Sequence, residues 1–151
     1  MRYVLLALMV AAAALSACRS YDAGGPSAGQ HESNYARVFR EPPAPDVTVL
    51  NSRVVSFRPG AAAADDYEFE LLAPGPWIAK TVKGFYMRPG QGEHLQNEMN
   101  LRRSPARAWY APKPLEQYDL YRDMANVRSV HMLVQKASEP DGRQRVFISR
   151  H

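Results

Sequence analysis

The sequence predicts an α+β or mainly β fold, in which a small antiparallel sheet or incomplete sandwich carries one or two short helices and follows a flexible tether. Three features predict it: apolar and acidic residues alternate over residues 66–72, two strand-like runs flank an Asp-Gly turn near the C-terminus, and residues 19–46 are rich in Gly and Pro. The 151 residues are 46% apolar and 23% charged, with a formal charge of +4, as in an ordinary globular protein. This length provides one modest domain, which we place at residues 47–151.

Two strands are expected at the start of this domain. Residues 47–57 are rich in Val and end at Arg58-Pro59-Gly60. Residues 66–72 place Tyr67, Phe69 and Leu71 on one face and Asp66, Glu68 and Glu70 on the other. This alternation predicts a half-buried strand that pairs with the first one and has a solvated acidic outer face. A cation site on the acidic row is disfavoured, because a calcium loop needs a turn with a glycine.

The middle of the domain is less regular. Residues 77–87 contain β-branched and aromatic side chains that favour a strand, although Pro76 as a first helical residue and Gly84 as a stop would suit a short helix. Residues 93–103 are consistent with a short helix or a loop. Residues 114–125 predict a helix, because Leu115, Tyr118, Tyr121 and Ala125 fall near one helical face.

The C-terminal part predicts a hairpin. Residues 127–136 and 143–150 are strand-like runs, and Asp141-Gly142 between them is a strong turn signal.

The first eighteen residues have the form of an export signal. Met1-Arg2-Tyr3 supplies a positive charge, and the uncharged apolar run of residues 4–14 is too short to span a membrane. The run ends in Leu15-Ser16-Ala17-Cys18, and a polar stretch begins at Arg19.

Leu15-Ser16-Ala17-Cys18 resembles the lipobox of bacterial lipoproteins. The resemblance implies that the Cys18 sulfur takes a diacylglyceryl group, that a signal peptidase cuts between Ala17 and Cys18, and that the new amine is acylated. Removal of residues 1–17 leaves 134 residues, and loss of Arg2 lowers the formal charge from +4 to +3. In Gram-negative lipoproteins, an Asp directly after the cysteine commonly retains the protein at the inner membrane. This position is Arg19 here, so the resemblance implies the outer membrane.

Residues 18–46 are interpreted as the lipidated N-terminus and the tether. The run 24–29 is small and flexible, whereas Pro42-Pro43-Ala44-Pro45 is stiff. Between them, residues 31–40 carry Tyr35, Val38 and Phe39. We favour a disordered spacer here over a segment that docks on the domain or on a partner.

No catalytic or metal-binding pattern stands out. Cys18 is the sole cysteine, which excludes an intramolecular disulfide and a Cys-rich zinc site. The four histidines, His31, His94, His131 and His151, lack metal-ligand spacing, and His94 beside Glu93 is the one candidate base. We therefore expect no catalytic residues, no metal and no cofactor.

A basic and aromatic segment provides the candidate partner-binding residues, which are Arg102, Arg103, Arg107, Trp109 and Tyr110. Arginine and aromatic side chains are enriched at protein–protein hot spots. The alternative places Trp109 in the core with arginines at its rim. Nucleic acid, which such a mixture also suits, is not an expected partner of an exported protein.

These features favour a non-enzymatic binding or scaffolding module, anchored in the membrane through Cys18 at the periplasmic face of the outer membrane. Its expected partner is an envelope protein or an anionic envelope polymer. The alternative is a ligand-binding or hydrolytic envelope protein that acts on cell-wall or lipid fragments. That alternative needs a pocket lined by Trp77, Phe85, Trp109 or Tyr118, with His94 and Glu93 as polar groups.

Overall fold

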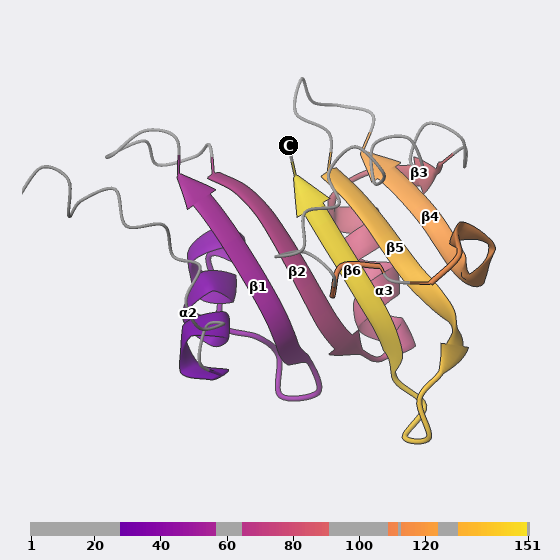
Figure 1. Ribbon diagram of the computed structural model, residues 1–151, viewed down its shortest axis with the longest axis horizontal. Coiled ribbons are helices and arrows are strands. Elements are labelled where there is room, and N and C mark those ends of the chain that lie inside the picture. The colour runs from indigo at the N-terminus through magenta and orange to yellow at the C-terminus, as the bar shows by residue number, and fades with distance from the viewer. Residues whose placement is uncertain (1–27, 57–64, 91–108, 112, 124–129, 151) are drawn as a thin grey trace, which may run out of the picture.

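The computed structural model describes residues 28–56, 65–90, 109–111, 113–123 and 130–150. Within these ranges the chain forms a six-stranded sheet with two α-helices (Figure 1). The strands are β1 (Thr48–Ser56), β2 (Asp65–Ala73), β3 (Met87–Pro89), β4 (Tyr118–Asp123), β5 (Val130–Ser138) and β6 (Gln144–Arg150). The helices are α2 (Ala28–Phe39) and α3 (Gly75–Gly84), and a 3-10 turn, η2 (Leu115–Gln117), precedes β4. The predicted α+β antiparallel fold is confirmed.

The strand order is β1-β2-β6-β5-β4-β3, and every neighbouring pair is antiparallel. The predicted pairing of the first two strands is confirmed, as is the C-terminal hairpin of β5 and β6. Gly142 has φ +81° in the hairpin turn, where its N–H donates to the Glu139 carbonyl at 2.9 Å. A left-handed backbone favours glycine, which explains why Asp141-Gly142 marks this turn.

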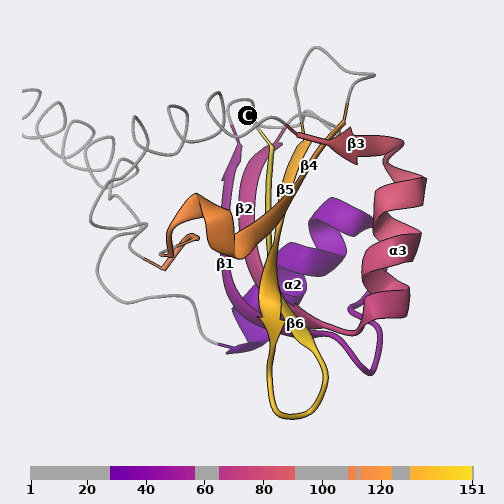
Figure 2. The ribbon, with the colours of Figure 1, turned by 90° about the vertical axis from the view of Figure 1, so that its right-hand side faces the viewer.

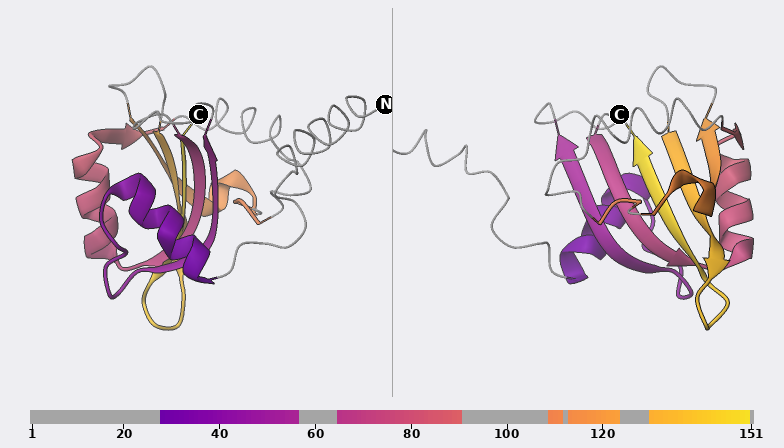
Figure 3. Two further views of the ribbon diagram at one scale, coloured as in Figure 1. Left: turned by 90° about the vertical axis from the view of Figure 1, so that its left-hand side faces the viewer. Right: turned by 45° about the vertical axis from the view of Figure 1, so that its right-hand side comes forward.

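Both helices cover the same face of the sheet. In Figure 2 the strands are seen edge-on, with α2 and α3 on one side and η2 on the other, and Figure 3 shows the same division from the opposite side. Fully buried side chains line this helix face, namely Phe69, Leu71, Met132, Val146 and Ile148. No helix within the described ranges combines the length and the apolar character that crossing a bilayer requires.

The opposite face of the sheet is also covered. Leu133 and Phe147 are fully buried there beneath Tyr118 and Ala111. The predicted solvated acidic face of β2 is therefore wrong for Glu68 and Glu70, which are 3% and 4% exposed. Tyr67, Phe69 and Leu71 do face the core together, as the alternation predicts.

Residues 75–84 form helix α3, so the predicted strand at 77–87 is wrong and the helical alternative is correct. Pro76 lies in the first turn, where a missing N–H costs nothing. Ile78, Val82 and Phe85 then recur at helical spacing and pack toward the sheet. Strand β3 follows directly and forms the edge of the sheet beside β4.

The predicted helix at 114–125 is also wrong. Only η2 is helical within the described part of this stretch, and the chain continues as β4, which pairs with β5 and β3. In a strand, alternate residues face opposite sides of the sheet. Tyr118 packs on the face opposite the helices, and Tyr121 packs on the helix face. Because both faces of β4 contact apolar clusters, its sequence does not show the alternation of apolar and polar residues that marks a half-buried strand.

The predicted boundary of the tether needs correction as well. Residues 28–39 form α2, and Tyr35 is only 1% exposed in the core. The rings of Tyr35 and Phe39 lie 6.0 Å and 5.6 Å from the ring of Phe69. The folded domain therefore includes Ala28–Phe39 and also residues 40–46 of the predicted tether, where Ala44 packs against the core. Residues 1–27, with Cys18, lie outside the described residues.

Candidate binding groove between helix α3 and strand β3

The residues predicted to bind a partner are only partly described. Arg102, Arg103 and Arg107 lie outside the described ranges, as do His94 and Glu93. Trp109 and Tyr110 are half-buried on the face opposite the helices, with their ring centroids 5.7 Å apart. Tyr110 also meets Phe147 edge-to-face at 5.5 Å. Tyr110 is thus fixed to the core on that face, and Trp109 lies against Tyr110.

The pocket that the hydrolytic alternative requires is not formed by its predicted aromatic residues. Trp77 and Phe85 pack against the core on the helix face. Tyr118 is buried on the opposite face, where its ring meets Phe147 at 5.8 Å. Because the sheet lies between Tyr118 and the other two rings, these side chains do not line one cleft.

A serine–histidine pair joins α2 to β1. His31 Nδ1 lies 2.9 Å from the Ser52 hydroxyl, and the side-chain amide of Asn34 donates to the same hydroxyl at 2.9 Å. His31 and Ser52 are 6% and 4% exposed. A nucleophile must reach its substrate, so this buried arrangement serves to dock the helix on the strand. No local sequence pattern indicates the pair, because the partners are 21 residues apart.

A second polar cluster lies on the face opposite the helices. The Glu70 carboxylate accepts hydrogen bonds from Arg145 at 2.7 Å and from the side-chain amide of Asn51. Arg145 also contacts Glu139 Oε1 at 3.2 Å. Burial acts to lower the pKa of Arg145, but its hydrogen bonds and charge interactions with Glu70 and Glu139 raise it overall. This cluster offsets the cost of burying the Glu70 carboxylate.

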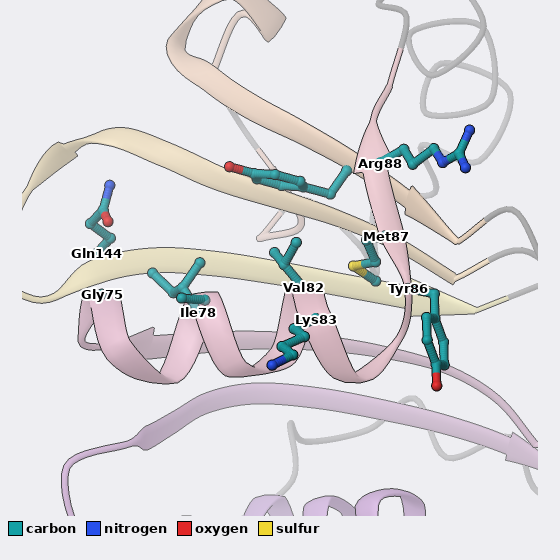
Figure 4. A pocket seen from close by; sticks show the side chains of 10 residues that line it. Gly75, Ile78, Val82, Lys83, Tyr86, Met87, Arg88 and Gln144 are labelled. Carbon is teal, nitrogen blue, oxygen red and sulfur yellow. The ribbon is translucent and has the colours of Figure 1, made fainter.

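A hollow lies between α3 and the β3 edge of the sheet (Figure 4). It has a volume of about 640 Å³. Ile78 and Val82 project from α3 toward the strands, and Met87 of β3 points back toward them. The other lining residues are Gly75, Ala79, Lys83, Tyr86, Arg88, Tyr121 and Gln144. The floor is therefore apolar, and we call this feature the α3–β3 groove.

Tyr86 stands at the end of the groove in a strained backbone conformation. Its N–H donates to the Lys83 carbonyl at 3.1 Å, just beyond the end of α3, and its φ is +51°. Glycine or asparagine usually occupies such a position, and another residue there costs about 1 kcal/mol or more. The ring is nevertheless 80% exposed. Tyr86 thus holds an aromatic ring in solvent at a cost in folding stability.

The rim of the α3–β3 groove is cationic. Lys83 and Arg88 line it, and their charged ends extend away from the apolar floor (Figure 4). Neither forms an ion pair with any residue that the structure describes. Arg88 is directly opposite Arg122 in the register of β3 and β4, an arrangement of like charges that is unfavourable. No carboxylate is among the lining residues in the described part of the chain.

The sequence from Lys83 to Arg88 does not by itself predict this groove. Two cations flank the exposed Tyr86 and the buried Met87 within six residues. Read as a strand, the stretch would point these side chains alternately to opposite faces of the sheet, so the pattern does not predict a shared surface. The helix end is what brings them together, because α3 stops and the chain turns sharply into β3.

Comparisons with protein-family models, with curated proteins and with solved structures find no match to this chain. Among the residues that the structure describes, no three His, Cys, Asp or Glu side chains gather in a way that could hold a metal ion. The arrangement that remains is an apolar floor, an exposed aromatic ring and a cationic rim. Such a surface suits a partner that is both apolar and anionic.

Proposed function

We propose that this protein is a lipid-anchored lipoprotein of the bacterial cell envelope whose domain acts as a non-enzymatic binding or scaffolding module. The observation that carries the proposal is Leu15-Ser16-Ala17-Cys18 at the end of the apolar run of residues 4–14. Small residues directly before a lone cysteine allow a membrane protease to reach the backbone, and the cysteine thiolate is the nucleophile that takes the lipid.

The position of the fold is compatible with this processing. Helix α2 begins at Ala28, ten residues after Cys18, so cleavage before Cys18 leaves every described element intact. Two or three acyl chains at one residue make attachment to a bilayer effectively permanent, because each buried methylene contributes about 0.8 kcal/mol. Arg19 after the cysteine supports the outer membrane, with the domain in the periplasm.

The binding role is supported by the surfaces that the described residues present. The serine–histidine pair is buried in a helix–strand contact, whereas the α3–β3 groove is open and has an exposed aromatic ring. The segment with Arg102, Arg103, Arg107, Trp109 and Tyr110 remains a second proposed contact surface. Its partner would be an envelope protein or an anionic polymer.

Metabolic labelling with an alkyne-bearing fatty acid tests the anchor. Because Cys18 is the sole cysteine, a thioether-linked lipid reports on one site. We expect wild-type protein to incorporate label and to sediment with outer membranes, and Cys18→Ala to lose both properties. Arg19→Asp is the matched control for sorting: it should keep the label and move to the inner membrane. Wild-type protein that incorporates no fatty acid and stays in the soluble fraction would contradict the proposal.

A further inference from the structure

We infer that the α3–β3 groove is a membrane-contact surface that lies against the anionic phospholipid headgroups of the leaflet that holds the lipid anchor. This inference rests on the proposed function, because the anchor is what brings the groove to a bilayer. It assigns the groove a partner, and it assigns Tyr86, Lys83 and Arg88 the contact with that partner.

The chemistry of the rim is the first support for a lipid partner. Lys83 and Arg88 have no ion-pair partner among the described residues, and Lys80, exposed one turn earlier on α3, has none either. Asp123, opposite Met87 in the strand register, is 3% exposed and does not line the groove. A surface with cations and, within the described part of the chain, no facing carboxylate complements phosphate groups.

The exposed ring of Tyr86 is the second support. Tyrosine is enriched at membrane–water interfaces, where its apolar body and polar hydroxyl lie at headgroup level. Tyr86 is 80% exposed although its left-handed backbone would be better served by glycine. Core packing does not explain why a tyrosine occupies this position, whereas contact of its ring with lipid headgroups does.

The short distance along the chain from the anchor to the fold is the third support. Nine residues lie between Cys18 and the start of α2 at Ala28, and the fully extended chain from Cys18 to Ala28 spans about 35 Å. The anchored domain therefore stays close to the bilayer at a high effective concentration. A surface contact that is weak in free solution is sufficient under these conditions.

The same observations disfavour two other occupants. A symmetric dimer through this groove would bring Lys83 and Arg88 of both copies together, with no carboxylate among the described lining residues to face them. An extended peptide would have to pair with β3, but that strand has three residues and ends in Pro89, which has no N–H to donate. Contact with a lipid surface needs neither a matching groove on a second copy nor hydrogen bonds to a strand edge.

The test uses the full lipidated chain in vesicles of phosphatidylcholine, with or without phosphatidylglycerol. Tyr86→Cys is labelled with an environment-sensitive aromatic fluorophore, which takes the place of the tyrosine ring, and lipids with spin-labelled headgroups serve as quenchers. Glu116→Cys, an exposed position in η2 on the opposite face of the sheet, is the matched control. We expect quenching at position 86 in phosphatidylglycerol vesicles, reduced by salt, and quenching at position 116 in neither vesicle.

Charge variants in the labelled background complete the design. Lys83→Gln with Arg88→Gln should reduce quenching at position 86 to the level of the control position. Lys113→Gln with Lys136→Gln removes the same charge at exposed positions that do not line the groove and should leave quenching unchanged. Equal, low quenching at positions 86 and 116 in both vesicles overturns the inference. Two other results also overturn the inference. A change in the fluorescence at position 86 that depends on protein concentration indicates a dimer, and a change that depends on added polyglutamate indicates an acidic peptide.

Failure of the anchor itself has a different signature. In the wild-type chain an acylated Cys18 takes no fluorophore, whereas a free Cys18 thiol does and the chain fails to incorporate into vesicles. In that case, co-sedimentation of the unanchored chain with phosphatidylglycerol vesicles still decides whether the groove binds lipid.

Discussion

Arg145 Nη1 lies 2.7 Å from the buried carboxylate of Glu70, on the face of the sheet opposite the helices. The two residues are 75 positions apart and belong to the neighbouring strands β6 and β2. Glu70 is 4% exposed. A carboxylate this deeply buried is stable only where a cation and other hydrogen-bond donors contact it, as Arg145 and the Asn51 amide contact Glu70. The Arg145–Glu70 pair thus links the C-terminal hairpin to the first half of the sheet.

Removal of Arg145 should therefore destabilise the fold. Arg145→Met leaves the Glu70 carboxylate buried beside one amide, and we expect the free energy of unfolding to fall by about 2–3 kcal/mol. The double variant with Glu70→Met should recover much of that loss, because no buried charge remains. Urea titrations of both single variants and the double variant provide the coupling energy. A coupling near zero would show that the pair does not act as described.

Helix α2 should be an integral part of the domain. Tyr35→Ala removes a fully buried ring that contacts Phe69 and Phe39, so the free energy of unfolding should fall by about 3 kcal/mol. Glu32→Ala, an exposed change in the same helix, should change it by less than about 0.5 kcal/mol. If both variants had equally small effects in urea unfolding, α2 would not be part of the folded domain.

Stability should decline at high pH because of Tyr67. Burial raises the pKa of Tyr67 from 10.0 to about 12. Above pH 10 the unfolded state loses the phenol proton while the folded state keeps it, so the contribution of Tyr67 is complete below pH 10 and is lost as pH rises through 12. This loss amounts to about 3 kcal/mol.

Tyr67→Phe isolates that contribution from the titration of lysines. The stability difference between wild type and Tyr67→Phe should be constant up to about pH 9 and then shift in favour of the phenylalanine variant. Thermal unfolding at a series of pH values measures it. Parallel curves up to about pH 12 would refute the role of Tyr67.

Tyr86→Gly should leave stability unchanged or raise it. Glycine relieves the left-handed backbone at φ +51°, which outweighs its greater entropy in the unfolded chain by up to about 1 kcal/mol. Met87→Ala, the neighbouring change, should cost about 3 kcal/mol because Met87 is buried. Calorimetry of the two variants compares them directly. A loss above about 1 kcal/mol for Tyr86→Gly would mean that the ring stabilises the fold.

Local patterns predict the elements in which sequence neighbours share an environment. Strand β2 alternates cleanly, and the β5–β6 turn contains Gly142 with its positive φ. Helix α3 departs from its predicted strand because β-branched residues favour strands in isolation, whereas packing of Ile78 and Val82 against the sheet determines the outcome.

Long-range contacts determine the rest. Helix α2 docks partly through the polar residues His31 and Asn34, whose partner Ser52 lies in β1. Its large apolar side chains, Tyr35, Val38 and Phe39, all come from its C-terminal half. The sequence of β2 alone predicts that Glu68 and Glu70 lie in solvent, because nothing in it indicates that Arg145 and a second apolar cluster cover that face. The groove could not be predicted for the same reason: it exists only once α3 ends beside β3.

Mass spectrometry of the N-terminal peptide of the protein purified from cell membranes tests the central proposal most directly. We expect a peptide that begins at Cys18 and carries a thioether-linked diacylglyceryl group, with a fatty acid on its amine. A peptide that begins at Met1, or one that contains Cys18 with a free thiol, would contradict the proposal.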